Sequence, residues 1–278
     1  MKLQKAAAHF NRMLCRDAYS GRAFGYGQLG LYDDSKRDTE GGERRIIEFA
    51  GDVEFPTRRT IQAAGTHYIL GHGFPDHAMG RVIRIKYVAH EATQLAKVQA
   101  LDDVCLSLAG TDLWAARAWV KDSKEVDESS QMIGVNHFHF SEAETINVSD
   151  IVTFDGVMNI VRKVMVGSAG TKIATCDELQ GAAVESTVLT NHTMDPVTQV
   201  ATSSPIPVKV LKVRWQSLFE FKDSASPAFQ PDNLQVVIAK SVAMPTVGST
   251  LSLTEGKARV VSILDRPDVW VCRVVLNG

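Results

Sequence analysis

The chain has 278 residues, of which 45% are hydrophobic and 22% charged, and its formal net charge is -2. This balance is typical of a globular protein long enough for one large or two modest domains. The near-neutral charge excludes recruitment of nucleic acid or an anionic membrane by overall charge alone.

The first periodic segment runs from residue 2 to about residue 17. Its apolar residues Leu3, Ala6 and Phe10 share one side, which predicts a short amphipathic helix. The segment lacks the unbroken apolar run of a secretory signal, and no run of about 18 apolar residues follows that would cross a bilayer. The four cysteines stand singly, which favours free core thiols over disulfides or a zinc site. We therefore expect a protein kept in a reducing cytoplasm, or assembled there into something larger, without membrane association.

The next stretch, GRAFGYGQLGLYDDSKRDTEGGERR, combines six glycines with many charges. Such a composition indicates an extended arm rather than a packed element. Its aromatic and basic residues predict an arm that orders against a neighbouring subunit, and the alternative is that it folds back on its own domain. The residues expected to make this intersubunit contact are Phe24, Tyr26, Leu31, Tyr32, Arg44 and Arg45. We assign residues 1–45 to the helix and arm.

From residue 46 the pattern becomes that of antiparallel strands, with β-branched and aromatic runs between glycine, proline and aspartate. Residues 46–190 are predicted to form a first β-rich domain, within which 91–145 fit either strand or helix and stay undecided. Residues 191–208 gather serine, threonine and proline without a period, which is typical of a linker. Residues 209–278 contain four or five short strands and predict a small barrel or sandwich. The fold class is thus mainly β, with small antiparallel barrels or sandwiches, a short N-terminal helix and an extended arm.

Three places share a local pattern in which a strand reaches a glycine and the next strand begins with two aliphatic residues. They are centred on Gly65, Gly156 and Gly256. Glycine adopts positive φ at little steric cost, so each position predicts a tight hairpin. Glycine hairpins occur in many all-β proteins, so the three positions indicate architecture rather than chemistry.

Histidines are the only candidates for metal ligands. His67, His72 and His77 recur at intervals of five near Asp76, but residues five apart on a strand point to opposite faces. His137 and His139 share one face of a strand, a spacing used by some metal sites, yet the solvent side of an amphipathic strand explains them more simply. Nucleotide-binding, metalloprotease and serine-hydrolase motifs are absent. We predict no catalytic residue, no metal and no cofactor, and a β-rich hydrolase with an unseen site stays an alternative.

Several stretches combine a glycine turn with paired strands, namely GLYDDSKRD, RRTIQAAGTHYILG, GRVIRIKYVAH, INVSDIVTFDGVMNIVRKV and GTKIATCDEL. These stretches resemble tailed-bacteriophage neck and head–tail connector proteins of the adaptor or stopper type. The C-terminal GSTLSLTEGKARVVSILDRPDVWVCRVVL is similar to the small barrel of such proteins. The resemblance lies in a repeated pattern in which a glycine turn is followed by a paired strand.

This resemblance implies a non-enzymatic virion subunit that joins the portal of the head to the tail. Copies would form a homo-oligomeric ring, contact portal and tail proteins, and let packaged DNA pass without sequence-specific binding. The long middle region departs from a minimal connector, which leaves the level in the neck open. The alternative from another class is a tail or baseplate protein that acts as a binding module.

Overall fold

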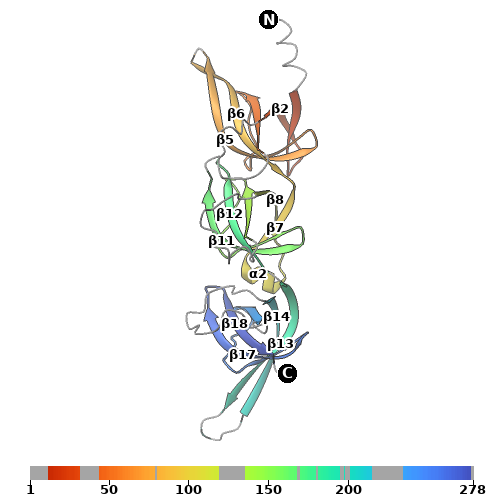
Figure 1. Ribbon diagram of the computed structural model, residues 1–278, viewed down its shortest axis with the longest axis vertical. Helices are drawn as coiled ribbons and strands as arrows, with labels where there is room; N and C mark the ends of the chain where they lie inside the picture. The colour runs from red at the N-terminus through yellow and green to blue at the C-terminus, as the bar shows by residue number, and fades with distance from the viewer. Residues whose placement is uncertain are drawn as a thin grey trace, which may run out of the picture. The chain divides into compact units, whose positions relative to one another are not determined.

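The computed structural model describes residues 12–31, 44–78, 80–118, 135–167, 170–179, 181–194, 197, 201–214 and 234–276. Within these ranges the chain forms eighteen strands and one short helix (Figure 1). Its contacts divide it into two compact units. The first unit comprises 1–97, 112–148 and 161–177, and the second comprises 98–111, 149–160 and 178–278. Each unit is described by itself.

The strands form three closed barrels of six strands each. The first barrel contains β1 (Arg12–Asp17), β2 (Ala23–Leu31), β3 (Arg44–Ala50), β4 (Thr60–Ala63), β5 (Thr66–Ala78) and β6 (Arg81–Ala92). The second contains β7 (Gln94–Gln99), β8 (Thr111–Ala118), β9 (Val135–Phe140), β10 (Ile151–Phe154), β11 (Val157–Val166) and β12 (Lys172–Glu178). The third contains β13 (Ala183–Met194), β14 (Ala201–Arg214), β15 (Leu234–Ala239), β16 (Thr250–Leu253), β17 (Gly256–Asp265) and β18 (Val269–Leu276).

One strand order is repeated in all three barrels. The first three strands form one antiparallel meander and the last three form another. The barrel closes because the third strand pairs with the sixth and the first strand pairs with the fourth. Closure leaves no free sheet edge along the barrel wall, so a small β domain avoids edge-to-edge aggregation. The predicted mainly β class with small antiparallel barrels is confirmed, but the repeat makes three barrels where the sequence indicated two β units.

The inside of the first barrel is filled by aromatic rings. Phe49, Phe55 and Tyr87 pack with ring centroids 4.7–6.0 Å apart, and Phe24 of β2 joins them. The glycines of β2 make room for this filling, because a Cβ on Gly27 would lie 3.0 Å from the Ile47 side chain and 3.1 Å from Cys15 Sγ. The glycine-rich composition of β2 therefore serves close packing inside the barrel.

The third barrel is filled by aliphatic residues instead. Residues on β14, β15 and β18 alternate between its interior and its outer surface, as the period of a strand requires. All six residues of β15 are nevertheless buried. Its outward residues Val237 and Ala239 are covered by the short helix α2 (Leu101–Leu106), whose Leu101, Val104 and Cys105 lie on one face. This double burial explains why β15 has a continuous apolar sequence.

Three expectations from the sequence need correction. The helix expected over 2–17 is wrong for Arg12–Asp17, which form β1, and its remainder lies outside the described residues. The arm expected over 21–45 is wrong for Ala23–Leu31 and for Arg44 and Arg45, which belong to β2 and β3 of the first barrel.

The linker expected over 191–208 is also wrong. Its described residues other than Val197 belong to β13 and β14, which pair from Ala183 and Lys212 to Met194 and Ala201. The undecided segment 91–145 contains β7, α2, β8 and β9 within its described residues. The first β-rich domain assigned to 46–190 thus contains most of the first barrel and all strands of the second.

Candidate functional site

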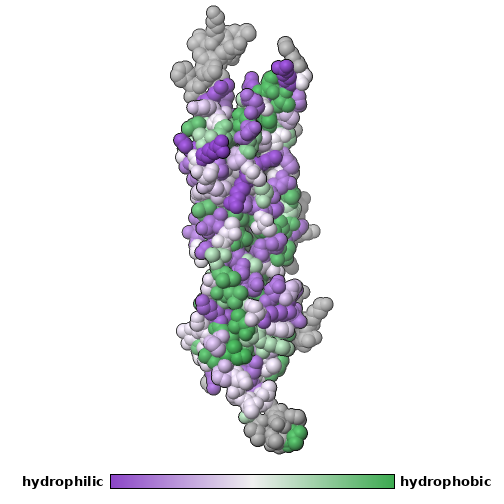
Figure 2. All heavy atoms as spheres, turned by 180° about the vertical axis from the view of Figure 1, so that it is seen from behind, coloured by the Kyte–Doolittle hydropathy of each residue, from purple (hydrophilic) through white to green (hydrophobic). Residues whose placement is uncertain are grey.

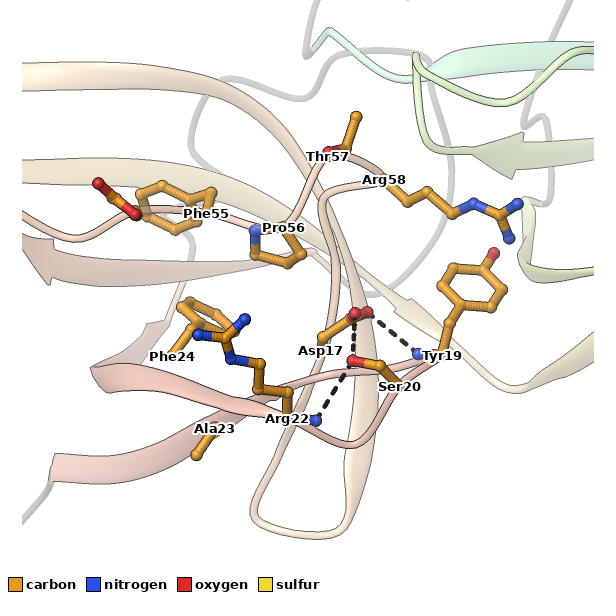
Figure 3. Close-up of a pocket in the computed structure, with 11 residues that line it drawn as sticks. Asp17, Tyr19, Ser20, Arg22, Ala23, Phe24, Phe55, Pro56, Thr57 and Arg58 are labelled. Carbon is orange, nitrogen blue, oxygen red and sulfur yellow. Dashed lines mark hydrogen bonds between the residues drawn. The ribbon is translucent and has the colours of Figure 1, made fainter.

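A cleft of about 710 Å³ opens on the first barrel, between the β1–β2 turn and the loop that leads into β4 (Figure 3). The turn supplies one wall and the loop supplies the other. The lining consists of Asp17, Tyr19, Ser20, Arg22, Ala23, Phe24, Glu54, Phe55, Pro56, Thr57 and Arg58. Polar and charged side chains thus surround a floor of two aromatic rings, Phe24 and Phe55.

Asp17 holds the β1–β2 turn in shape. Its carboxylate accepts hydrogen bonds from the Tyr19 backbone N–H at 3.1 Å and from Ser20 Oγ at 2.6 Å. The Ser20 hydroxyl oxygen in turn accepts the N–H of Arg22 at 3.3 Å, as the dashed lines in Figure 3 show. Aspartate and serine commonly satisfy turn amides in this way. The turn is therefore locally ordered, and the Arg22 side chain extends from it beside Phe24.

Tyr19 connects this turn to the second barrel within the first unit. Its hydroxyl donates to Glu144 Oε1 at 3.0 Å and accepts the backbone N–H of Trp114 at 3.2 Å. The Arg58 guanidinium lies 4.6 Å from the centre of the Tyr19 ring, and its Nε is 3.8 Å from Glu144. Burial raises the pKa of Tyr19 to about 12, and the nearby Glu144 carboxylate adds to the rise. Tyr19 therefore stays a hydrogen-bond donor at neutral pH.

The cleft has the groups of a binding surface. Arg22 and Arg58 offer cationic donors, whereas Asp17 and Glu54 offer acceptors, and the aromatic floor offers apolar contact. A general base of suitable pKa beside a nucleophile is what hydrolysis requires. The Asp17 carboxylate beside Ser20 accepts two hydrogen bonds of the turn, so this pair stabilises the loop.

The three glycines lie in the same hairpin of each barrel, the one between the fourth and fifth strands. In the first two barrels the turns are Ala64-Gly65 and Asp155-Gly156, and all four residues have positive φ between 50° and 85°. Both glycines are thus the second residue of a two-residue turn with the twist that hairpins favour. In the third barrel the two turn residues precede the glycine, so Gly256 is the first residue of β17 and has a φ of 134°.

The residues assigned to an intersubunit arm take other places. Phe24 packs inside the first barrel, and Tyr26 is 60% exposed on its outer surface. Leu31 ends β2, and Arg44 and Arg45 begin β3. Tyr32 lies outside the described residues.

The histidines of the described ranges lie on several different strands. Among the described residues, no group of three or more His, Cys, Asp or Glu side chains is arranged to hold an ion. His67 stacks on Trp114, and His137 contacts Thr175 at 3.2 Å. The expectation that His139 faces solvent is wrong, because its side chain is 1% exposed and stacks on His90 of the first barrel. Phe138 and Phe140, on the opposite face of β9, are buried as well.

All four cysteines are free and buried. Burial raises the pKa of Cys15 to about 11, that of Cys105 to about 12 and that of Cys272 to about 12. Burial also raises the pKa of Cys176. Because the thiolate is the reactive form, these side chains behave as small apolar core residues at neutral pH.

Comparisons with known proteins give no relative. No protein-family model, no curated protein and no solved structure matches the chain. Within the described ranges, no helix is long and apolar enough to cross a membrane. The class of protein is thus defined by its fold alone, as three repeats of a six-stranded closed barrel.

Sequence reasoning missed the contacts of Tyr19, Arg58 and Glu144. Tyr19 lies 125 positions and Arg58 lies 86 positions before Glu144 in the chain, so no local sequence pattern connects them. The repeat itself left a signal in the three glycine turns, which mark the same hairpin of each barrel.

Proposed function

We propose that this chain is a non-enzymatic structural subunit of a tailed-phage virion, which joins the portal to the tail as part of a homo-oligomeric ring. Copies of the chain would assemble in the host cytoplasm, and packaged DNA would pass through the ring without sequence-specific contacts. The proposal begins from the resemblance of the glycine-turn and paired-strand stretches to connector proteins.

The observation that carries a subunit role is an exposed apolar surface on the third barrel. The loop before β16 exposes Met244 by 65%, Val247 by 66% and Val242 by 38%. Val242 also borders a hollow of about 360 Å³ beside Pro207 and Leu106. On the face drawn in Figure 2, hydrophobic residues gather over this barrel. Exposed apolar surfaces of this kind mark contacts with other proteins, and in a ring the partner is a second copy.

Closed barrels suit such a subunit. Their walls have no free edges, so copies are joined through side chains and through segments between strands rather than by uncontrolled strand pairing. The inert, buried thiols and the turn-bound Asp17 and Ser20 also favour a structural role over a hydrolytic one.

Negative-stain imaging and mass photometry of the full chain test the proposal. A ring with a central hole is expected, whereas a stable monomer over the micromolar range would overturn it. The double variant Met244→Asp with Val247→Asp should shift the population to monomers. Val135→Asp is the matched control, because Val135 is also exposed, by 49%, but lies on the second barrel.

The prediction that an N-terminal arm joins subunits has to be tested with a deletion shorter than residues 1–45. Removing that range would delete β1 and β2 and open the first barrel. Deletion of residues 1–11 leaves every described strand intact. Loss of rings in this variant would show that the N-terminal residues join subunits, and unchanged rings would assign the contact to the barrels.

The polar cleft favours a second candidate, a tail or baseplate protein that acts as a binding module. Its paired cationic and anionic groups would fit an extended polypeptide segment of another virion component. A monomeric chain that loses binding to purified virions after Arg22→Glu, while keeping its fold, would favour this candidate over the ring.

A further inference from the structure

Histidines concentrate where the first barrel meets the second, within the first unit. Four histidines lie on β5 and β6, and His67, His72 and His90 among them contact the second barrel. His67 stacks on Trp114 of β8, with ring centroids 3.6 Å apart and planes tilted by 15°. His90 stacks on His139 of β9 at 4.2 Å and 17°. His72 lies so close to Gly170 that a Cβ there would be 2.4 Å from its Cγ.

The His90–His139 pair is fully enclosed. Each side chain is 1% exposed, and His139 Nδ1 lies 2.9 Å from the Thr171 hydroxyl. Neutral imidazole rings stack like other aromatic rings. Two imidazolium rings at 4.2 Å would repel each other and would lose hydration in an enclosed site. The observed geometry therefore fits rings that are not both charged.

Other charged and titratable groups surround this junction, and most of them have contacts of their own. Glu144 bonds Tyr19 and lies 3.8 Å from Arg58, and Lys172 donates to the Glu144 carbonyl. On β8, Arg117 donates to Asn136 at 2.5 Å, and Asp112 is exposed. On β9, His137 contacts Thr175, and on β6 Glu91 lies opposite Tyr68 in the register of β5 and β6.

We infer that the contact between the first and second barrels is a pH-sensitive junction, which holds while the stacked His67, His90 and His139 are neutral and opens when they are protonated. Burial lowers the pKa of His67 and of His137. A histidine with a lowered pKa in the fold contributes its full stability above its unfolded value of about 6.5, and the contribution is lost as the pH falls below that value. Each such histidine raises the opening constant by about tenfold per pH unit in that window.

The contact of α2, β10 and β11 with the third barrel, within the second unit, is an internal reference. It is made by aliphatic residues such as Ile151, Ile160 and Val237, with Cys105 among them. These groups do not titrate between pH 5 and pH 7.5, so this second junction should keep its contacts when the first one opens.

Amide hydrogen exchange of the full chain measures both junctions at once. Exchange rates at pH 7.5 and pH 5.5, corrected for the intrinsic pH dependence of exchange, give the opening constants of peptides from β8–β9 and from α2. The first set should rise by at least tenfold at pH 5.5, and the second set should not. An equal rise in both sets would overturn the inference, because it would indicate general acid unfolding.

His90→Phe keeps a ring in the stack but removes one titrating group. The rise of the β8–β9 opening constant should fall by about tenfold in this variant. His192→Phe is the matched control, since His192 is exposed on β13 and outside the junction, and it should behave like the wild type. Equal rises in both variants would contradict a role of the histidine pair.

A second readout serves if His90→Phe does not fold. Trp114 fluorescence should decrease as the stacked His67 becomes protonated, with Trp114→Phe as the blank and His67→Phe removing the pH dependence. A Trp114 signal that is constant from pH 7.5 to pH 5.5 would overturn the inference.

Discussion

The two junctions between barrels both contain an isoleucine at the same position of the fifth strand, but the side chains around it differ in chemistry. In the first unit, Ile69 of β5 packs with Ala92 against Ala116 and Trp114 of the second barrel. In the second unit, Ile160 of β11 packs with α2 against the third barrel. Ile69 and Ile160 are equivalent by register, because each pairs with the first residue of the preceding strand, Thr60 or Ile151. Around this shared aliphatic contact, the first junction adds histidines and a tyrosine–glutamate–arginine group, whereas the second adds only apolar side chains.

The third barrel differs at the same position. Arg259 pairs with Thr250 there and replaces the isoleucine. An isoleucine on the fifth strand thus accompanies packing against a following barrel, and the arginine stands where no described barrel follows.

The strands that α2 and the second barrel pack against also differ from the corresponding strands of the first barrel. A cross-strand row on the outside of the third barrel, Leu211, Val237 and Val271, is completely buried. On the corresponding strands of the first barrel the row is Gln28, Glu48 and Lys86. Lys86 forms ion pairs with Asp76 at 3.0 Å and with Glu48 at 3.9 Å on that surface. The row on the first barrel is thus polar, whereas the corresponding row on the third barrel is apolar and covered.

The largest expected effect comes from placing a charge in the second junction. Val237→Asp would bury a carboxylate among α2, β15 and β18, with an expected loss of about 4 kcal/mol of unfolding free energy. Val275→Asp is the matched control, because Val275 is 42% exposed on the outer face of β18, and its effect should stay below about 0.5 kcal/mol. Urea unfolding measures both. Similar midpoints for the two variants would contradict the burial of Val237 by α2.

Local patterns predicted the parts of the fold that depend on neighbouring residues. The glycine turns at Gly65 and Gly156 were visible because a two-residue hairpin depends on positive φ at adjacent positions. The linker expected over 191–208 failed for a physical reason. The β13–β14 hairpin is stabilised by hydroxyl contacts, such as Thr193 with Thr202 at 2.8 Å, and these leave no apolar alternation in the sequence.

The junctions and the cleft could not be predicted in the same way. His139 looked like a solvent-facing residue because β9 alternates, and only a separate barrel buries its outer face. Tyr19 likewise gains its role from Trp114 and Glu144, which are distant in sequence. Tertiary contacts of this kind leave no periodic signal.

The second prediction separates acid sensitivity of the third barrel from that of the first junction. Lys212 is 6% exposed, and its Nζ donates to Glu185 at 2.8 Å and to Glu255 at 2.7 Å. Lys212→Met leaves both carboxylates without this partner and should cost about 3 kcal/mol at pH 7. Lys257→Met, at an exposed position of β17, is the control and should have little effect.

The pH dependence of this loss has a defined sign. Burial alone would raise the pKa of Glu255, but hydrogen bonds from Lys212 and Arg214 lower it to about 2. A carboxylate with a lowered pKa in the fold contributes stability above its ordinary value of 4.5, and the contribution is lost as the pH falls towards 2. The difference between wild type and Lys212→Met should therefore be constant from pH 7 to about 5 and should shrink below that. A difference that changes near pH 6 would assign the acid response of the histidine junction to this network instead.

The smallest expected loss of unfolding free energy concerns the polar contacts of the first junction. Tyr19→Phe removes the hydroxyl that donates to Glu144, which is 5% exposed, and that accepts the Trp114 N–H. Two partners lose a hydrogen bond while the ring keeps its contact with Arg58, so we expect a loss of about 1.5 kcal/mol. Tyr26→Phe, on the exposed face of β2, should change the unfolding free energy by less than about 0.3 kcal/mol. Because the pKa of Tyr19 is raised to about 12, the loss should be the same at pH 7 and pH 9. Equal urea midpoints for Tyr19→Phe and Tyr26→Phe would mean that the first junction rests on its aliphatic and stacked contacts alone, which would make it energetically closer to the second junction than its polar groups indicate.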